Sequence, residues 1–173
     1  MKEKTTTPKN KAGKLCTVIG TVCILLVIGL CALVVLPGNF GWHMYDVLSG
    51  SMEPELPVGS LIYVRGTQPE EVKEGDIIAF YSSVENGGVI THRVVENNVV
   101  SGKLRTKGDA NDTEDPLPVE YEQYIGQVAF HLPYFGKILT CMTMPYGKIA
   151  AACVIALGLI LNLAGSRMRI EEA

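Results

Sequence analysis

The stretch LCTVIGTVCILLVIGLCALVVL, Leu15–Leu36, is a run of 22 residues without a charged side chain. A hydrocarbon core about 30 Å thick needs roughly 20 apolar residues in a helix, so this run is long enough to span a membrane. The lysine-rich segment before it is typical of a signal peptide, but the apolar stretch is too long for one, and no A-x-A-like site closes it. We therefore expect an uncleaved transmembrane helix over 15–36.

A second apolar run, IAAACVIALGLILNLA, covers Ile149–Ala164 and is 16 residues long. It lies near the lower length limit for a span, and a buried core helix is the alternative. Lys148 and Arg167 flank the run, and their long side chains can reach the two interfaces. We expect a second transmembrane helix over 145–166.

The charges next to the two runs predict the orientation. Residues 1–14 hold five Lys and one Glu, and the tail 167–173 holds Arg167 and Arg169. Lys and Arg in short flanking segments mark the cytoplasmic side, so both ends are expected inside and residues 37–144 outside a cell membrane. This outer segment has 7 Lys+Arg against 15 Asp+Glu, a net charge of 7 − 15 = −8, which argues against nucleic acid as a partner.

The five cysteines indicate neither a disulfide framework nor a metal site. Four lie within the apolar runs, and Cys141 lies just before the second run. Residues 37–140 have none, so the clusters typical of disulfide scaffolds or zinc sites are missing from the sequence. No metal and no cofactor are implied.

The outer segment 37–144 has the pattern of a β domain. Short apolar, β-branched runs recur about every 10–15 residues, with Gly, Asn and Pro between them, which predicts a sheet or a partly closed barrel. The fold class is therefore mainly β, with one transmembrane helix at each end. The expected strands are Ser60–Gly66, Gly75–Ser82, Val89–Glu96, a hairpin turning at Ser101-Gly102, and Tyr124–Leu132.

One turn in this domain carries a candidate nucleophile. The turn is SGSMEPELPVGS, Ser49–Ser60, with Ser51 between a glycine and a methionine. Pro54 and Pro57 fix the backbone, which makes the stretch a poor flexible linker. A serine hydroxyl is a weak nucleophile and needs a neighbouring base to take its proton.

Three histidines are candidates for that base. His43, in GNFGWHMYDVL, is typical of an aromatic segment at a membrane interface, and His131 lies at a strand end. His92, in VITHRVV, shares one face of a strand with Ile90 and Val94. From His92 alone, a half-buried structural histidine remains the alternative to a base.

The third region is acidic. A carboxylate directed at a histidine fixes its tautomer and stabilises the imidazolium that forms during proton transfer. A plain solvated loop is the alternative for such a run, and a Ca²⁺ loop is disfavoured because the EF-hand spacing is missing. The region is TKGDANDTEDP, Thr106–Pro116, with carboxylates at Asp109, Asp112, Glu114 and Asp115.

Together the three regions resemble the type I signal peptidases. The resemblance is to their endoplasmic-reticulum and archaeal branch, which also occurs in some endospore-forming Gram-positive bacteria. The main bacterial branch has a lysine where this chain has His92, so a Ser–Lys dyad is not expected. Family members often read GDNN where this chain reads GDAN. The matching motifs are SGSMEP at Ser49–Pro54, THRVV at Thr91–Val95 and TKGDANDTED at Thr106–Asp115, and with the first helix they span about residues 15–130.

The resemblance implies a role for each motif residue. It makes Ser51 the nucleophile and His92 the general base. It makes Asp115 the carboxylate partner of the histidine and Asp109 a second essential acid. The Ser49 hydroxyl is expected to help the Ser51 backbone N–H hold the oxyanion.

The implied activity is removal of signal peptides from secretory precursors, after small residues at Ala-x-Ala-like sites. The expected partners are these precursors and the lipid bilayer. The resemblance to the endoplasmic-reticulum branch adds other membrane subunits to the expected partners. A LexA-like self-cleaving domain is disfavoured, because it uses a lysine base and has no membrane anchors. A membrane-anchored, non-enzymatic β domain for surface or pilus assembly is the remaining alternative, and an intact Ser–His–Asp set argues against it.

Overall fold

The computed structural model describes residues 11–83 and 88–170, with the side chains of the last two left out. The chain divides into two compact units. One contains the residues up to Leu33 and those from Met142 onward, and the other is residues 34–141. Each unit is described by itself.

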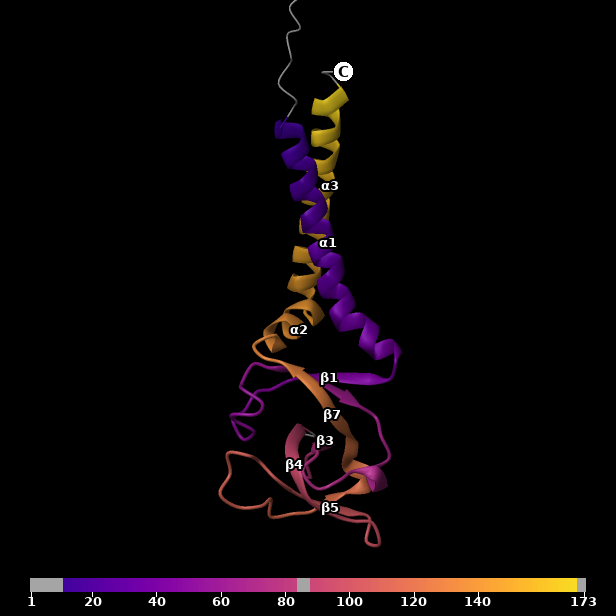
Figure 1. Ribbon diagram of the computed structural model, residues 1–173, viewed down its shortest axis with the longest axis vertical. Coiled ribbons are helices and arrows are strands. Elements are labelled where there is room, and N and C mark those ends of the chain that lie inside the picture. The colour runs from indigo at the N-terminus through magenta and orange to yellow at the C-terminus, as the bar shows by residue number, and fades with distance from the viewer. Residues whose placement is uncertain (1–10, 84–87, 171–173) are drawn as a thin grey trace, which may run out of the picture. The chain divides into compact units, whose positions relative to one another are not determined.

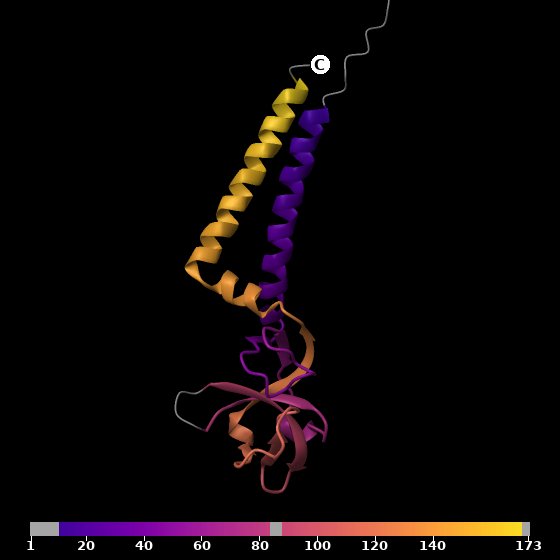
Figure 2. The same ribbon diagram turned by 90° about the vertical axis from the view of Figure 1, so that its left-hand side faces the viewer.

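The first unit consists of two long helices, α1 (Lys11–Asn39) and α3 (Pro145–Ile170), which run antiparallel and side by side (Figures 1 and 2). The contact is close because glycines meet. A Cβ on Gly20 would come within 2.5 Å of the Gly158 carbonyl oxygen. Small residues allow helices to approach in this way, and a polar pair adds a hydrogen bond between them. The Thr21 hydroxyl donates to Asn162 Oδ1 at 3.2 Å.

Both helices are long and apolar enough to cross a membrane. The most apolar 18-residue window has a mean hydropathy of 3.1 in Lys11–Asn39 and of 2.2 in Pro145–Met168. The expected span 15–36 lies inside α1, which continues past Leu36 through Pro37 to Asn39. The length and the composition of the two helices fit a membrane protein.

The second unit is a curled antiparallel sheet of seven strands in the order β1-β2-β7-β3-β4-β5-β6 (Figure 1). Irregular register in three strand pairs, at Tyr63/Val64, Ala79/Phe80 and Val94/Glu96, bends the strands and helps the sheet curl. The predicted fold class, a mainly β domain with a helix at each end, is confirmed. The strands are β1 (Trp42–Asp46), β2 (Leu61–Arg65), β3 (Ile77–Tyr81), β4 (Val89–Asn98), β5 (Lys103–Lys107), β6 (Val119–Glu120) and β7 (Tyr124–Leu132).

Side chains alternate along β3 and β4, so the sheet buries a different cluster on each face. The first cluster contains Val72, Ile78, Phe80, Val94, Leu104 and Val119. The second contains Met52, Leu56, Ile62, Val64 and Ala79.

Two members of the second cluster come from the loop that carries the candidate nucleophile. Met52 and Leu56 are only 2% and 1% exposed. Burying such side chains stabilises a fold by about 1.5–3 kcal/mol each. The residue before Met52 is Ser51, so packing of the second cluster fixes where that serine lies.

Among the strands and α-helices, three were not expected from the sequence. Residues 42–46 form β1, which pairs with β2 along its whole length, from Trp42 opposite Arg65 to Asp46 opposite Leu61. The strand β6 is only two residues long, and α2 (Gly136–Thr143) is a short helix after β7. The pairing of β1 joins residues far apart in the chain, which a local pattern does not reveal.

Candidate active site

The loop between β1 and β2 is tied at both ends. The Val47 N–H donates to the Ser60 carbonyl oxygen at 2.9 Å, and the Gly59 N–H donates to the Val47 carbonyl oxygen at 2.8 Å. Two prolines within the loop restrict its backbone further. Hydrogen bonds at both ends of the loop and the buried side chains of Met52 and Leu56 together fix the position of Ser51.

The structure brings Ser51, His92 and Asp115 together. His92 Nε2 lies 3.1 Å from Ser51 Oγ, and His92 Nδ1 lies 2.6 Å from Asp115 Oδ2. This is the order of contacts that nucleophilic catalysis needs: a hydroxyl, a base in reach of it, and a third group that orients the base. The side chains of His92 and Asp115 are 10% and 18% exposed, so water competes little for their contact.

The Asp115 carboxylate is itself held in place. Thr106, on β5, donates its hydroxyl to the same Oδ2 atom at 2.6 Å. The Asp115 N–H donates to the Thr106 carbonyl oxygen at 2.9 Å. Two strands therefore position the pair: β4 carries the histidine, and β5 carries the residue that holds its partner.

Asp109 lies elsewhere in the acidic loop and contacts a different residue. Its two carboxylate oxygens accept from Arg93 Nε at 2.8 Å and from Arg93 Nη2 at 2.6 Å. Arg93 follows His92 on β4 and therefore points to the opposite face. The hydrogen bond to Asp109 raises the pKa of Arg93 above its ordinary value, so the guanidinium stays charged.

Arg93 also contacts the turn before β3. Its Nη1 donates to the Gly75 carbonyl oxygen at 2.7 Å. Of the two predicted site carboxylates, Asp115 contacts His92. Asp109 instead holds the acidic loop against β4 through its pair with Arg93.

The loop also packs directly on the serine. The Ala110 N–H donates to the Ser51 carbonyl oxygen at 2.9 Å. Gly108 is buried against the same oxygen, and a Cβ there would come within 2.6 Å of it. Only glycine allows the two backbones to come this close, which explains the glycine at position 108 of the motif. Ser49, the predicted oxyanion residue, places its Oγ 3.4 Å from Ser51 Oγ.

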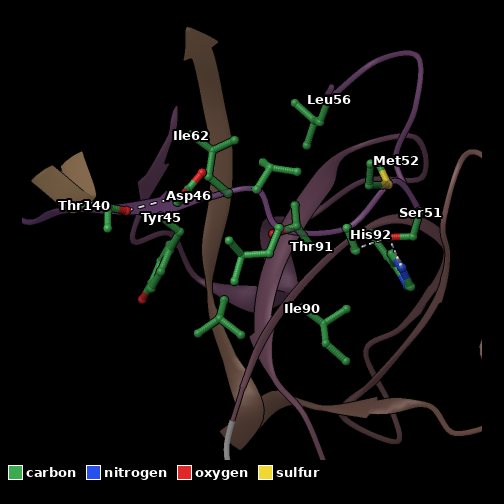
Figure 3. Close-up of a pocket in the computed structure, with 14 residues that line it drawn as sticks. Tyr45, Asp46, Ser51, Met52, Leu56, Ile62, Ile90, Thr91, His92 and Thr140 are labelled. Atoms are coloured by element: carbon green, nitrogen blue, oxygen red, sulfur yellow. Dashed lines mark hydrogen bonds between the residues drawn. The ribbon is translucent and has the colours of Figure 1, made fainter. Parts of the chain in front are cut away.

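A cleft of about 690 Å³ extends from the serine (Figure 3). Ser51 and His92 lie at one end of it, and Tyr45, Asp46 and Thr140 lie at the other. Its walls between these ends are mostly apolar, and Met52, Leu56 and Ile62 of the second cluster contribute to them.

An unpaired strand edge borders the cleft. Residues 89–92 of β4 pair with β3 on one side. The strand β5 pairs with β4 only from Arg93 onward, so within the described residues the other edge of 89–92 has no strand partner. Such an edge can accept an extended peptide as an additional strand.

Sequence reasoning missed the far end of the cleft. Asp46 Oδ2 accepts from the Thr140 hydroxyl at 3.3 Å, which ties α2 to β1. Among the described atoms, Asp46 Oδ1 is buried without a hydrogen-bond partner, and a Cβ on Gly136 would overlap it. Burial raises the pKa of Tyr45 above its ordinary value, with a smaller contribution from Tyr81, so the phenol remains neutral. No local signal in the sequence joins residues 46 and 140.

The other two histidines lie on different strands from His92. His43 is exposed on β1, opposite Val64, and His131 lies on β7, opposite Ile62. Neither lines the cleft.

Residues 20–97 match the protein family described as signal peptidase, peptidase S26. The signal peptidase complex catalytic subunit SEC11 of Scheffersomyces stipitis is 31% identical over 125 residues, which are 64% of this chain and 74% of that protein. The chain belongs to the signal peptidase S26 family. The family predicted from the motifs is confirmed, and the SEC11 relatives match the predicted endoplasmic-reticulum branch.

Two more relatives of this signal peptidase family member come from Bacillus subtilis and Rattus norvegicus. Signal peptidase I W of Bacillus subtilis (strain 168) is 41% identical over 101 residues, which are 56% of this chain and 52% of that protein. The signal peptidase complex catalytic subunit SEC11C of Rattus norvegicus is 32% identical over 123 residues, which are 65% of this chain and 62% of that protein. The chain thus spans less than two thirds of the length of these two relatives.

Proposed function

We propose that this chain is a membrane-bound serine endopeptidase that removes N-terminal signal peptides from secretory precursors. One observation carries the proposal: Ser51, His92 and Asp115 are joined by contacts of 3.1 and 2.6 Å at the end of an apolar cleft. Membership of the signal peptidase family supports the reaction class. A non-enzymatic assembly subunit has no need for this geometry.

In the proposed reaction Ser51 Oγ attacks the carbonyl carbon of the last signal-peptide residue, and His92 Nε2 accepts the hydroxyl proton. Asp115 accepts the Nδ1–H of the ring and stabilises the imidazolium. His92 then passes the proton to the leaving amine, the peptide C–N bond breaks, and the mature protein departs. Water, deprotonated by the same ring, hydrolyses the ester that remains on Ser51.

The developing oxyanion needs donors on the far side of the attacked carbonyl. We assign this role to the Ser51 backbone N–H and the Ser49 hydroxyl, whose Oγ lies 3.4 Å from the nucleophilic oxygen. Removing one such donor typically costs about 3–4 kcal/mol of transition-state stabilisation.

We propose that the substrate binds as an extended strand along the free edge of β4, beside the loop that carries Ser51. Backbone hydrogen bonds to such an edge supply affinity without regard to side chains. The residues one and three before the cut then point into the cleft, beside Met52 and Ile62. Small side chains at these two positions, as in Ala-x-Ala sites, suit this arrangement.

We further propose that α1 and α3 both span a cell membrane, with both ends cytoplasmic and the β domain on the other side. The basic residues outside each helix support this orientation. Ser51 follows Leu36 by fifteen residues, which keeps the nucleophile within a short length of chain from the first span. Because the SEC11 relatives are named as subunits of a complex, further membrane subunits are included among the proposed partners.

The test is cleavage of a secretory precursor with an Ala-x-Ala site by the full chain in proteoliposomes. Wild type is expected to cut after the second alanine, and Ser51→Ala and His92→Ala are expected to be inactive. Ser101→Ala, in the β4–β5 turn, and the exposed His43→Ala are matched controls that are expected to cut normally.

Two results would contradict the proposal. If Ser51→Ala cuts as fast as wild type, Ser51 is not the nucleophile. If wild type cuts none of a panel of such precursors, the assembly-subunit interpretation takes its place. A further variant, His92→Lys, asks whether the base of the main bacterial branch can act in this site.

A further inference from the structure

A second, smaller hollow lies beside the catalytic residues. Its volume is about 150 Å³, and a dry cavity of roughly that size can take a benzene ring. It shares Ile90 and His92 with the cleft, but its other walls differ: Phe80 from β3 and Leu117 from the loop after Asp115. The hollow is therefore next to the cleft and not a part of it.

Val89 and Thr91, on one face of β4, line the cleft alone, whereas Ile90 and His92, on the other face, line both hollows. Val89 packs with the cluster that contains Met52 and Leu56, on the cleft side. Ile90 packs with the cluster that contains Phe80, on the other side. In Figure 3, Ile90 lies on the side of its strand away from Leu56 and Met52. The free edge of β4 separates the two hollows.

A peptide added to that edge continues the pleat of the sheet, so its successive side chains point to opposite faces. If the residues one and three before the cut enter the cleft, the residue between them must point to the face of Ile90 and His92. That is the face with the second hollow. The middle residue of an Ala-x-Ala site is therefore directed into it.

We propose that this hollow is a specificity site for the substrate side chain two residues before the cut, and that it takes apolar side chains. The proposal rests on the proposed signal-peptidase function and adds a preference within it. It distinguishes among precursors that all satisfy the small-x-small rule.

The lining supports an apolar preference. Ile90, Phe80 and Leu117 supply hydrocarbon walls, and Leu117 is 59% exposed, so a substrate side chain has apolar surface to cover. Pro116 and Pro118 flank Leu117 and restrict the backbone that carries it. The Asp115 carboxylate borders the hollow, which disfavours an acidic side chain at this substrate position.

The test compares kcat/KM for three precursors that differ only in the middle residue: Ala-Leu-Ala, Ala-Gly-Ala and Ala-Asp-Ala. Wild type is expected to prefer leucine to glycine by about tenfold, the lower end of what apolar pockets achieve. Aspartate is expected to be the slowest of the three.

Two variants connect the preference to the hollow. Leu117→Ala is expected to bring the leucine-to-glycine ratio close to one. The matched control Val100→Ala changes a fully exposed apolar residue in the β4–β5 turn and is expected to keep the wild-type ratio. When a fourth precursor, Ala-Lys-Ala, is added to the set, Leu117→Asp is expected to cut it faster than the other three.

Each outcome decides a different point. If wild type cuts the leucine and glycine precursors equally fast, the specificity site is refuted while the peptidase function stands. If Leu117→Ala keeps the wild-type ratio, the preference exists but this hollow does not cause it, and the proposal is again refuted. If no precursor is cut, the proposed function itself fails.

Discussion

Replacing Asp115 by asparagine tests the role of the carboxylate with almost no change in shape. Asp115 Oδ2 lies 2.6 Å from His92 Nδ1, with both side chains less than a fifth exposed. At that distance and an effective dielectric constant of about 20, the attraction between carboxylate and imidazolium is roughly 6 kcal/mol. Asparagine removes the charge, and an amide N–H turned toward Nδ1 favours the tautomer with its proton on Nε2, which cannot take the serine proton.

Since each 1.36 kcal/mol is about tenfold in rate, the full attraction corresponds to roughly four to five powers of ten. The amide keeps part of the interaction, so we expect kcat to fall by about 10³–10⁴, as for a triad whose acid becomes an amide. On a precursor with glycine in the middle position, which places no side chain in the second hollow, KM is expected to change little because Asp115 does not line the main cleft.

The assay is kcat and KM on a purified precursor in detergent, together with the thermal unfolding midpoint. Asp112→Asn is the matched control, because Asp112 is an exposed carboxylate in the same loop, and it is expected to keep wild-type kcat. If Asp115→Asn keeps kcat within tenfold of wild type while the fold is intact, the orienting role of Asp115 is refuted.

Three further predictions concern the support of the site. Asp109→Asn weakens the pair with Arg93 and is expected to lower the unfolding free energy measured in urea by about 1–2 kcal/mol. Its loss of kcat is expected to be smaller than that of Asp115→Asn. An equal loss of kcat with unchanged stability would contradict the supporting role of Asp109. Gly108→Ala places a methyl group against the Ser51 carbonyl oxygen and is expected to lower kcat about 100-fold. A wild-type kcat would show that the contact between residue 108 and the Ser51 carbonyl oxygen does not position the serine. Leu56→Ala removes a side chain that is 1% exposed and is expected to cost roughly 2–5 kcal/mol in the same urea titration; a loss below 1 kcal/mol would mean that the loop is not anchored there.

The elements predicted from the sequence are those with a strong local pattern. The expected strands Val89–Glu96 and Tyr124–Leu132 correspond to β4 and β7, because β-branched and aromatic residues recur there between turn residues. The aromatic residues around His43 are typical of a membrane-interface segment, whereas the structure has the first strand, Trp42–Asp46, there. Its strand character depends on pairing with Leu61–Arg65, which no local window contains.

Helical boundaries show the same limit. The helix α1 continues through Pro37 to Asn39, beyond the expected span 15–36, and Pro37, which lacks a backbone N–H, lies in its last turn. The helix α2 has only eight residues, too few for a helical period to stand out.

The candidate site was predicted from motifs, and its geometry was not. The residues themselves left open which carboxylate of the acidic loop meets the histidine. The answer depends on how Thr106 holds Asp115 and how Arg93 holds Asp109, and both contacts follow from the side-chain directions on β4 and β5. The second hollow likewise requires the three-dimensional path of the loop after Asp115.

The central claim is that Ser51 and His92 act as one catalytic unit, and a double-mutant cycle tests it most directly. The measurement is kcat for Ser51→Ala, His92→Ala and the combined variant on one precursor. Residues that act as a unit give losses that do not multiply, so the double variant is predicted to be no slower than the slower single variant. Losses that multiply, or a single variant with nearly wild-type kcat, would contradict the account.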